Sequence, residues 1–252
     1  MAIVLLVLGL VLSAVMRMAI TQRETLEFNE TQQRLAAAQQ ALLAFAITYG
    51  RLPCPATVFS QGQESPAGGG KCTNAHGFLP GRTLGLSPMN THGESVDAWH
   101  QPIHYVVATE SAPPQGVTAT CLSAAFTDTN RLKTNGLRCL PDQLNVCSSS
   151  LGAGFSPTSC GKPAGSQAVG STNNLANNNT IVALLFSTGK NWARTAHDIT
   201  RVDERINLNA TNIFISHLPQ PADAPGGEFD DQFTWISIGM LYDKLVTVGQ
   251  LP

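Results

Sequence analysis

The stretch that decides the fold is MAIVLLVLGLVLSAVM, residues 1–16, after which the chain has no proline before Pro53. The stretch carries no charge, and Arg17 ends it. Sixteen helical residues rise about 24 Å, which is less than the ~30 Å hydrocarbon core that about 20 residues span. We therefore expect residues 1–20 to be a transmembrane or hydrophobic helix segment, with further apolar residues ahead of Met1. The alternative is a cleaved signal followed by a separate surface helix.

Residues 21–49 continue this helix as an amphipathic segment. Glutamate, glutamine and arginine alternate with apolar residues spaced three, four or seven apart, which is the spacing of one helix face. The face holds Phe28, Leu35, Ala38, Leu42, Phe45 and Tyr49, and we expect it to be the packing face of the helix. Of these residues, Leu35, Leu42 and Phe45 are expected to pack on the chain's own sheet. Gly50 and Pro53 predict that the helix ends at Tyr49.

Composition limits what the rest of the chain does. Of the 252 residues, 43% are hydrophobic and 13% are charged, and the formal net charge is −2. The chain can bury a substantial core, but it has no basic field for a nucleic-acid partner. We interpret residues 50–252 as one globular head.

Six cysteines lie in this head, at positions 54, 72, 121, 139, 147 and 160. None of them forms a C-x-x-C pair, and their spacing does not match that of zinc ribbons. Behind a membrane-exit segment, disulfides are the better interpretation. A disulfide between Cys54 and Cys72 would close a loop of about 18 residues and stabilise the fold by about 3 kcal/mol. Cys121, Cys139, Cys147 and Cys160 allow three pairings, which the sequence leaves open.

The head is predicted to be rich in strands. Short β-branched and aromatic runs bounded by turn residues occur at 103–109, 181–187, 212–216 and 233–238, and 240–248 is compatible with a short closing helix. The fold class is therefore α+β with an antiparallel or mixed sheet. In residues 148–180, 22 of 33 residues are Ser, Gly, Asn, Thr or Pro, so we expect a long exposed loop tethered at Cys160.

Five segments occur in an order that resembles one known family. They are GRLPCP (Gly50–Pro55), GFLPGRTLGL (Gly77–Leu86), DAWHQPIHYVV (Asp97–Val107), FDDQFTW (Phe229–Trp235) and LYDKLVTVGQLP (Leu241–Pro252). Following a long amino-terminal helix, they resemble the type IV pilin-like, type II secretion pseudopilin-like family over nearly the whole chain.

The resemblance implies a pilin-like fold, in which a long amino-terminal helix packs on an antiparallel or mixed sheet head with long loops. It also implies a structural subunit, a minor pilin or pseudopilin, of a type IV pilus or a type II secretion-like filament. Its partners would be other such subunits, through the amino-terminal helix, and inner-membrane lipid. The chain would cross the inner membrane once, with its head in the periplasm or on the cell surface.

Family members carry features that would precede Met1. These are a basic leader cleaved after a glycine, an amino-methylated phenylalanine and a glutamate in the membrane segment. We therefore expect Met1 to be an internal methionine. The competing interpretation is a membrane-tethered or secreted binding module or adhesin that joins no filament.

Functional residues of other kinds are not strongly indicated. No G-x-S-x-G, H-E-x-x-H or G-x-G-x-x-G motif occurs, so we expect neither an enzyme nor a cofactor. His100 and His104 are interpreted as surface or turn residues. Asp230 and Asp231 could join the loop Phe186–Gly189 in a calcium site, but a capping or ion-paired aspartate pair is the preferred interpretation, and no metal site is predicted.

Overall fold

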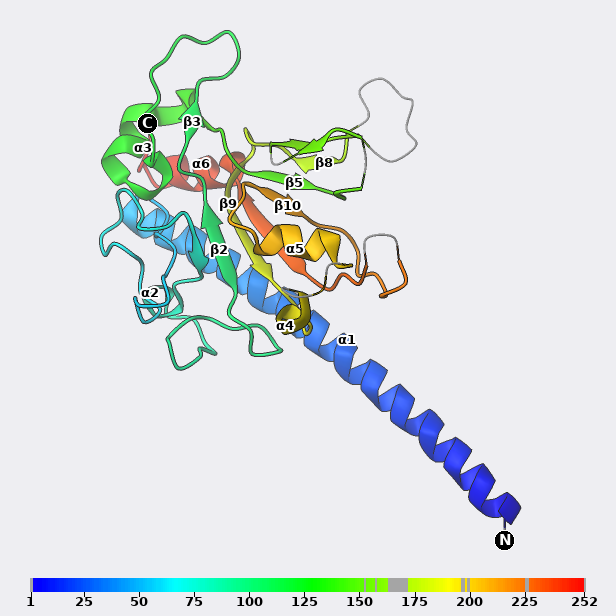
Figure 1. Cartoon of the computed structure of the whole chain (residues 1–252). Helices are drawn as coiled ribbons and strands as arrows, with labels where there is room; N and C mark the ends of the chain where they lie inside the picture. The colour runs from blue at the N-terminus through cyan, green and yellow to red at the C-terminus, as the bar shows by residue number, and fades with distance from the viewer. Residues whose placement is uncertain are drawn as a thin grey trace.

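One uninterrupted helix precedes a head of strands, short helices and loops (Figure 1). The computed structural model describes residues 2–151, 153–156, 158–162, 172–195, 198, 200–224 and 227–251, with side chains from residue 22 onward except that of residue 194. The helix, α1 (Ala2–Tyr49), ends where the sequence predicts. Gly50 follows with φ +67°, and its N–H donates to the carbonyl of Ala46 at 2.8 Å, which is a glycine-terminated helix end.

The head contains short elements joined by long connections. The helices are α2 (Gly81–Leu84), η1 (Ala125–Thr127), α3 (Thr129–Asn135), η2 (Gly136–Arg138), α4 (Trp192–Thr195), α5 (Val202–Leu208) and α6 (Ile238–Thr247). The strands are β1 (His76–Phe78), β2 (His104–Val107), β3 (Ser111–Ala112), β4 (Leu140–Pro141), β5 (Asn145–Cys147), β6 (Phe155–Ser156), β7 (Ser159–Cys160), β8 (Asn174–Ala176), β9 (Ile181–Ser187), β10 (Ile213–Ile215) and β11 (Gln232–Ser237).

The central sheet has four strands in the order β1-β2-β9-β11, and all of its neighbours are antiparallel. The strand β9 lies inside the sheet and all seven of its residues are buried, which fits its unbroken run of apolar side chains. A second sheet, β10-β5-β8, pairs β10 with β5 in parallel and β8 with β5 antiparallel. The fold is therefore α+β with antiparallel and mixed sheets.

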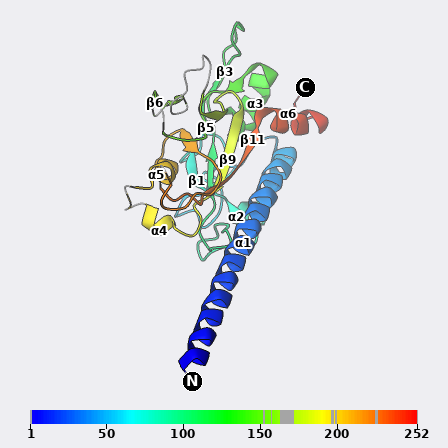
Figure 2. The same cartoon turned by 90° about the vertical axis from the view of Figure 1, so that its right-hand side faces the viewer.

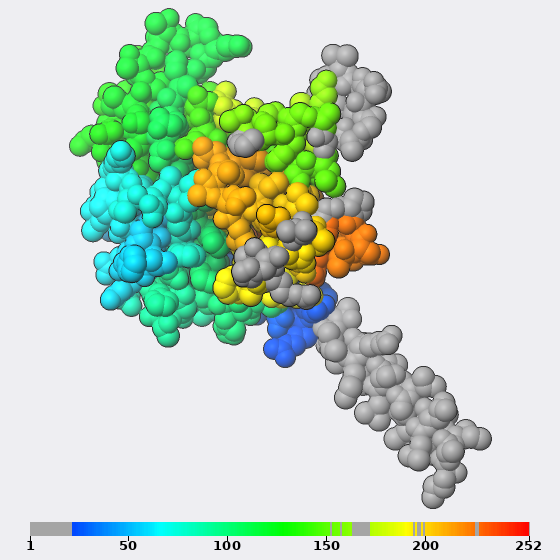
Figure 3. Space-filling model, viewed as in Figure 1, coloured from blue at the N-terminus to red at the C-terminus, as the bar shows by residue number. Residues whose placement is uncertain are grey.

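The central sheet lies between two layers. In Figure 2 the carboxy-terminal half of α1 lies along one side of the sheet, and α5 lies on the other side. The side chains that form the core include Leu42, Tyr105, Leu184 and Phe214, none of which has exposed surface. The amino-terminal half of α1 extends away from the head, and the space-filling view shows its described side chains emerging at the base of the head (Figure 3).

The predicted closing helix is α6, which begins two residues earlier than expected. Ser237 caps it, because its hydroxyl accepts a hydrogen bond from the N–H of Met240 at 3.2 Å. Leu241 and Leu245 are fully buried on the face that meets the core cluster. The hydroxyl of Tyr242 donates to the carbonyl oxygens of residues 136 and 139, so α6 is also attached to the segment around η2.

Three disulfides link the head, and they use all six cysteines. The predicted Cys54–Cys72 bond is present. Among the last four cysteines, the structure selects the pairing of sequence neighbours, Cys121–Cys139 and Cys147–Cys160. The last of these ties β5 to the short hairpin of β6 and β7, so Cys160 does anchor the polar segment that follows.

Most of the described residues in 148–180 are exposed or half-buried, but the segment is not one loop without strands. It contains β6, β7 and β8, and β8 pairs with β5 in the second sheet. Asn173 is buried, and its backbone carbonyl accepts from the N–H of Ser148 at 2.7 Å. Small polar residues give no periodic signal for such strands, which depend on pairing with β5 and on the disulfide. Residues 152, 157 and 163–171 of the predicted loop lie outside the described residues.

Candidate functional site

The contact between α1 and the head is the first candidate site. Leu35, Leu42 and Phe45 of the predicted stripe are buried, and Phe28, where the helix leaves the head, is half-buried. Tyr49 is 55% exposed, although its ring stays 4.3 Å from that of Phe45 between centroids. The three side chains expected to pack on the sheet are therefore buried, whereas Tyr49, in the last turn of the packing stripe, is largely exposed.

Polar groups fix the position of α1 along the sheet. The guanidinium of Arg34 donates to the backbone carbonyls of Val96 and Asp97. The hydroxyl of Thr31, which is fully buried, accepts from the N–H of Ala98 at 3.1 Å. Farther along the helix, the side-chain amide of Gln39 donates to the carbonyl of residue 235 at 2.7 Å. These bonds define one register between the helix and the head, since each satisfies a specific backbone group.

The opposite face of α1 is free of the head. Gln33, Ala37, Gln40 and Ala44 are exposed and lie four, three and four residues apart, so they form one stripe. Leu26 continues this stripe toward the amino terminus and is 68% exposed. Alanine and glutamine on such a stripe allow another helix to approach closely and to hydrogen-bond across the contact.

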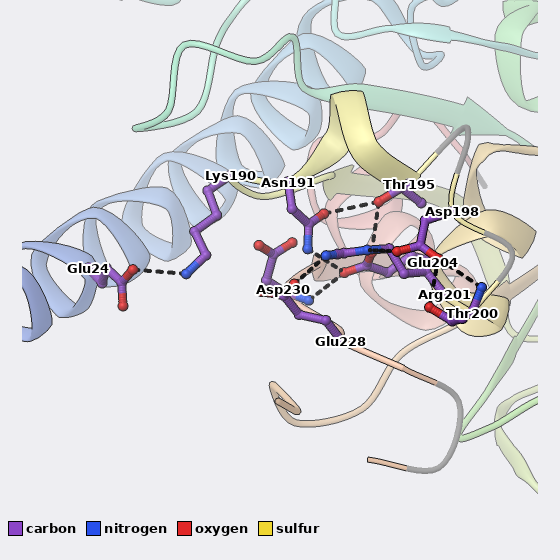
Figure 4. Close-up of polar contacts among 10 residues, drawn as sticks. All are labelled: Glu24, Lys190, Asn191, Thr195, Asp198, Thr200, Arg201, Glu204, Glu228 and Asp230. Carbon is purple, nitrogen blue, oxygen red and sulfur yellow. Dashed lines mark hydrogen bonds and ion pairs between the residues drawn. The ribbon is translucent and has the colours of Figure 1, made fainter. Parts of the chain in front are cut away.

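A cluster of carboxylates lies close to the place where α1 leaves the head, and it is the second candidate site (Figure 4). One oxygen each from Glu204, Asp230 and Asp231 lies within 4.8 Å of the others. Glu204 is on α5, whereas the two aspartates directly precede β11. Lys190 follows β9 and lies beside the cluster. Its Nζ forms an ion pair with Oε1 of Glu24 on α1 at 2.9 Å.

Glu204 is satisfied by four donors despite being buried. One of its oxygens accepts from the backbone N–H of Asp230 at 2.8 Å and from Asn191 at 3.2 Å. The other accepts from the hydroxyl of Thr195 at 2.8 Å and from Arg201 at 3.2 Å. Arg201 also pairs with Glu228. This network joins α4, α5 and the segment before β11 (Figure 4).

Asp230 is the exception in the cluster. Both of its carboxylate oxygens are buried and have no hydrogen-bond partner among the described residues. Burial, followed by the charges of Glu204 and Glu228, raises the pKa of Asp230 to about 8, although Lys190 acts in the opposite direction. The carboxyl is therefore held largely protonated at neutral pH when no cation is bound.

The carboxylate of Asp231 is more deeply buried than that of Asp230, but it has a hydrogen-bond partner. Its carboxylate accepts from the side-chain amide of Asn207 at 2.7 Å. Burial and the charge of Glu204 raise its pKa well above the usual value. Asn207 in turn exchanges hydrogen bonds with the backbone of Ile215, so the aspartate is connected to β10.

The cluster can balance its negative charge in two ways. Arg201 is the one guanidinium in direct contact with it among the described residues, so Asp230 keeps a proton unless a further cation is present. The three carboxylates offer the oxygen ligands that a divalent cation such as calcium accepts. The raised pKa of Asp230 and the three grouped oxygens are thus compatible with a bound proton or with a bound cation.

Sequence reasoning found part of this cluster. It singled out Asp230 and Asp231, and the predicted neighbour loop is adjacent, because a Cβ at Gly189 would overlap the carboxylate of Asp230. It missed Glu204 of α5 and Arg201, the residue before α5, which lie more than two dozen residues upstream in a charged segment typical of a solvated face. No local signal indicates that these two side chains turn inward.

Comparisons with known proteins do not assign a function to this chain. The chain matches no protein-family model, no curated protein and no solved structure. Over the described side chains, no helix is both long and apolar enough to cross a membrane. The side chains of residues 1–20, the expected transmembrane segment, lie outside that description.

Proposed function

We propose that this chain is a pilin-like structural subunit, a minor pilin or pseudopilin, that assembles into a filament through α1. The observation that carries the proposal is the division of one continuous helix. Its carboxy-terminal half is built into the head, and its amino-terminal half extends beyond it (Figure 1). Thr31 is the first buried residue of α1 among its described side chains, which begin at residue 22, and the 29 helical residues before it would extend about 43 Å at 1.5 Å per residue.

Three further features support assembly by helix packing. The apolar residues 1–16 suit lipid before assembly and neighbouring helices afterwards. The stripe of Gln33, Ala37, Gln40 and Ala44 remains available on the face that the head leaves free. The three disulfides suit a head that works in an oxidising compartment outside the cytoplasm.

The test uses the protein expressed from its native locus, with upstream sequence included. Ala37→Glu places a charge on the exposed stripe, where the isolated subunit tolerates it but a helix–helix contact would bury it without a partner. Ala222→Glu is the control, because Ala222 is exposed on the head. We expect the Ala37 variant to be exported and oxidised normally but lost from the filament fraction, while the Ala222 variant assembles.

A tethered or secreted binding module gives a different result. In that case both variants behave like the unmodified protein, and a photo-cross-linker placed at Ala44 yields no adduct with another subunit. Mass spectrometry of the amino-terminal peptide separates the interpretations further. An amino-methylated phenylalanine ahead of Met1 supports the filament subunit, whereas an end near Ala19 indicates a cleaved signal and contradicts it.

A further inference from the structure

A cavity of about 470 Å³ lies on the side of the central sheet away from α1. Its floor includes Phe78, His104 and Phe186 from three neighbouring strands. Phe214 of β10 and the segments 56–59 and 207–210 form its walls. Cavities of a few hundred cubic ångströms are the size that encloses small organic ligands.

The floor belongs to a row of four rings that crosses the whole sheet. Phe78 is paired with His104, His104 with Phe186, and Phe186 with Phe233 in the strand register. The distances between successive ring centroids are 5.2, 4.6 and 5.1 Å. Cross-strand neighbours project from the same face of a sheet, so the register places the rings next to one another. The planes of Phe78 and His104 are tilted by 50°, whereas His104 and Phe186 (14°) and Phe186 and Phe233 (12°) are stacked, so neighbouring rings cover one another's faces.

His104 gives this surface its polar group. It is not the surface or turn histidine that the sequence suggested, since its ring packs between two phenylalanines. Burial lowers the pKa of His104 to about 4, so the imidazole is neutral at physiological pH. A neutral imidazole has one donor and one acceptor, and neither has a protein partner among the described residues.

The lining and the mouth of the cavity select against charged ligands. None of the described residues that line it is Asp, Glu, Lys or Arg. Two apolar side chains at the mouth are left in solvent, Phe59 with 91% and Val58 with 55% of their surface exposed. A bound aromatic group that contacts these side chains would remove apolar surface from water.

We propose that this cavity is a binding site for a neutral, planar aromatic group that carries one hydroxyl or N–H, as in a naphthol or an indole. The group packs against the apolar lining beside Phe78, His104 and Phe186, and its heteroatom hydrogen-bonds to the free imidazole nitrogen. The proposal is independent of filament assembly, because the cavity and α1 lie on opposite sides of the sheet.

The first experiment measures binding of 2-naphthol to the purified full chain, with the same detergent or lipid carrier alone as blank. Binding should shift the NMR signal of the His104 Cε1–Hε1 group and saturate. Replacing 2-naphthol with N-acetyltryptophanamide tests whether the aromatic group is accepted as a free molecule or as a peptide side chain. Absence of saturable binding for both probes overturns the proposal.

Two variants test the geometry. Ala210→Trp fills the mouth from an exposed position and should abolish binding, while Ala222→Trp, exposed and distant from the cavity lining, should leave binding unchanged. His104→Phe keeps an aromatic ring in the lining but loses the nitrogen. This substitution should weaken the binding of 2-naphthol about tenfold. It should leave the binding of naphthalene, which has no hydroxyl, unchanged. Equal binding by the Ala210 and Ala222 variants would refute the assignment of the site.

Discussion

Asp230→Asn tests whether the carboxylate cluster stores a proton. The pKa of Asp230 is raised from 3.8 to about 8 in the folded protein. Between these values the folded chain holds the proton and the unfolded chain does not. The stability that this group contributes is therefore present at low pH and is lost as pH rises through about 8.

The magnitude follows from the width of this window. Stability changes by about 1.4 kcal/mol per pH unit for one proton, so between about pH 5 and about pH 8 Asp230 lowers the free energy of unfolding by about 4 kcal/mol. Asparagine has nearly the same shape and does not titrate. We expect the variant to gain about 4 kcal/mol relative to the unmodified protein between about pH 5 and about pH 8, or about 10 °C in melting temperature.

Thermal unfolding of both proteins across this range, in the presence of EDTA, is the assay. The quantity to compare is the difference in melting temperature between the variant and the unmodified protein at each pH. Other titrating groups affect the melting temperatures of both proteins alike. His104 is one such group, since its lowered pKa contributes stability that is lost as pH falls from 6.5 toward 4. Asp223→Asn, the same substitution at an exposed position, is the control.

A constant difference between the Asp230 variant and the unmodified protein at every pH would refute the buried, protonated carboxyl. Calcium provides a second comparison at about pH 8. A cation held by Glu204, Asp230 and Asp231 would replace the proton and stabilise the unmodified protein alone. Reversal of the order of the two melting temperatures on adding calcium would therefore identify the cluster as a cation site.

Three further predictions concern the core, the disulfides and the aromatic row. Leu42→Ala removes a fully buried side chain of α1 and should cost about 3 kcal/mol in chemical denaturation, whereas Leu26→Ala, at a side chain 68% exposed, should cost less than about 0.5 kcal/mol. Replacing both Cys54 and Cys72 by serine should lower the unfolding free energy by about 3 kcal/mol, and an unchanged denaturation midpoint would contradict the bond. NMR titration of His104 should give a midpoint near 4, and a midpoint near 6.5 would mean that its ring is open to water.

Local sequence determined the elements of this protein. The helix α1 follows from a long run without proline, and its end follows from Gly50, whose positive φ favours glycine. The strand β9 coincides with its predicted range, Ile181–Ser187, because an apolar run bounded by turn residues is a local signal. The one-sided pattern of residues 21–49 likewise indicated which side of α1 would be buried, with the exposed Tyr49 as the exception.

Only the tertiary structure decided what these elements bring together. The row of Phe78, His104, Phe186 and Phe233 depends on the register between strands that are far apart in sequence. The inward position of Glu204 depends on the packing of α5 against the segment before β11. Both arise from long-range pairing, and a shift of one residue in strand register would turn each ring to the other face of the sheet. Periodicity along the chain carries no record of that register, so the aromatic row is not visible in the sequence alone, and of the carboxylate cluster the sequence indicates only Asp230 and Asp231.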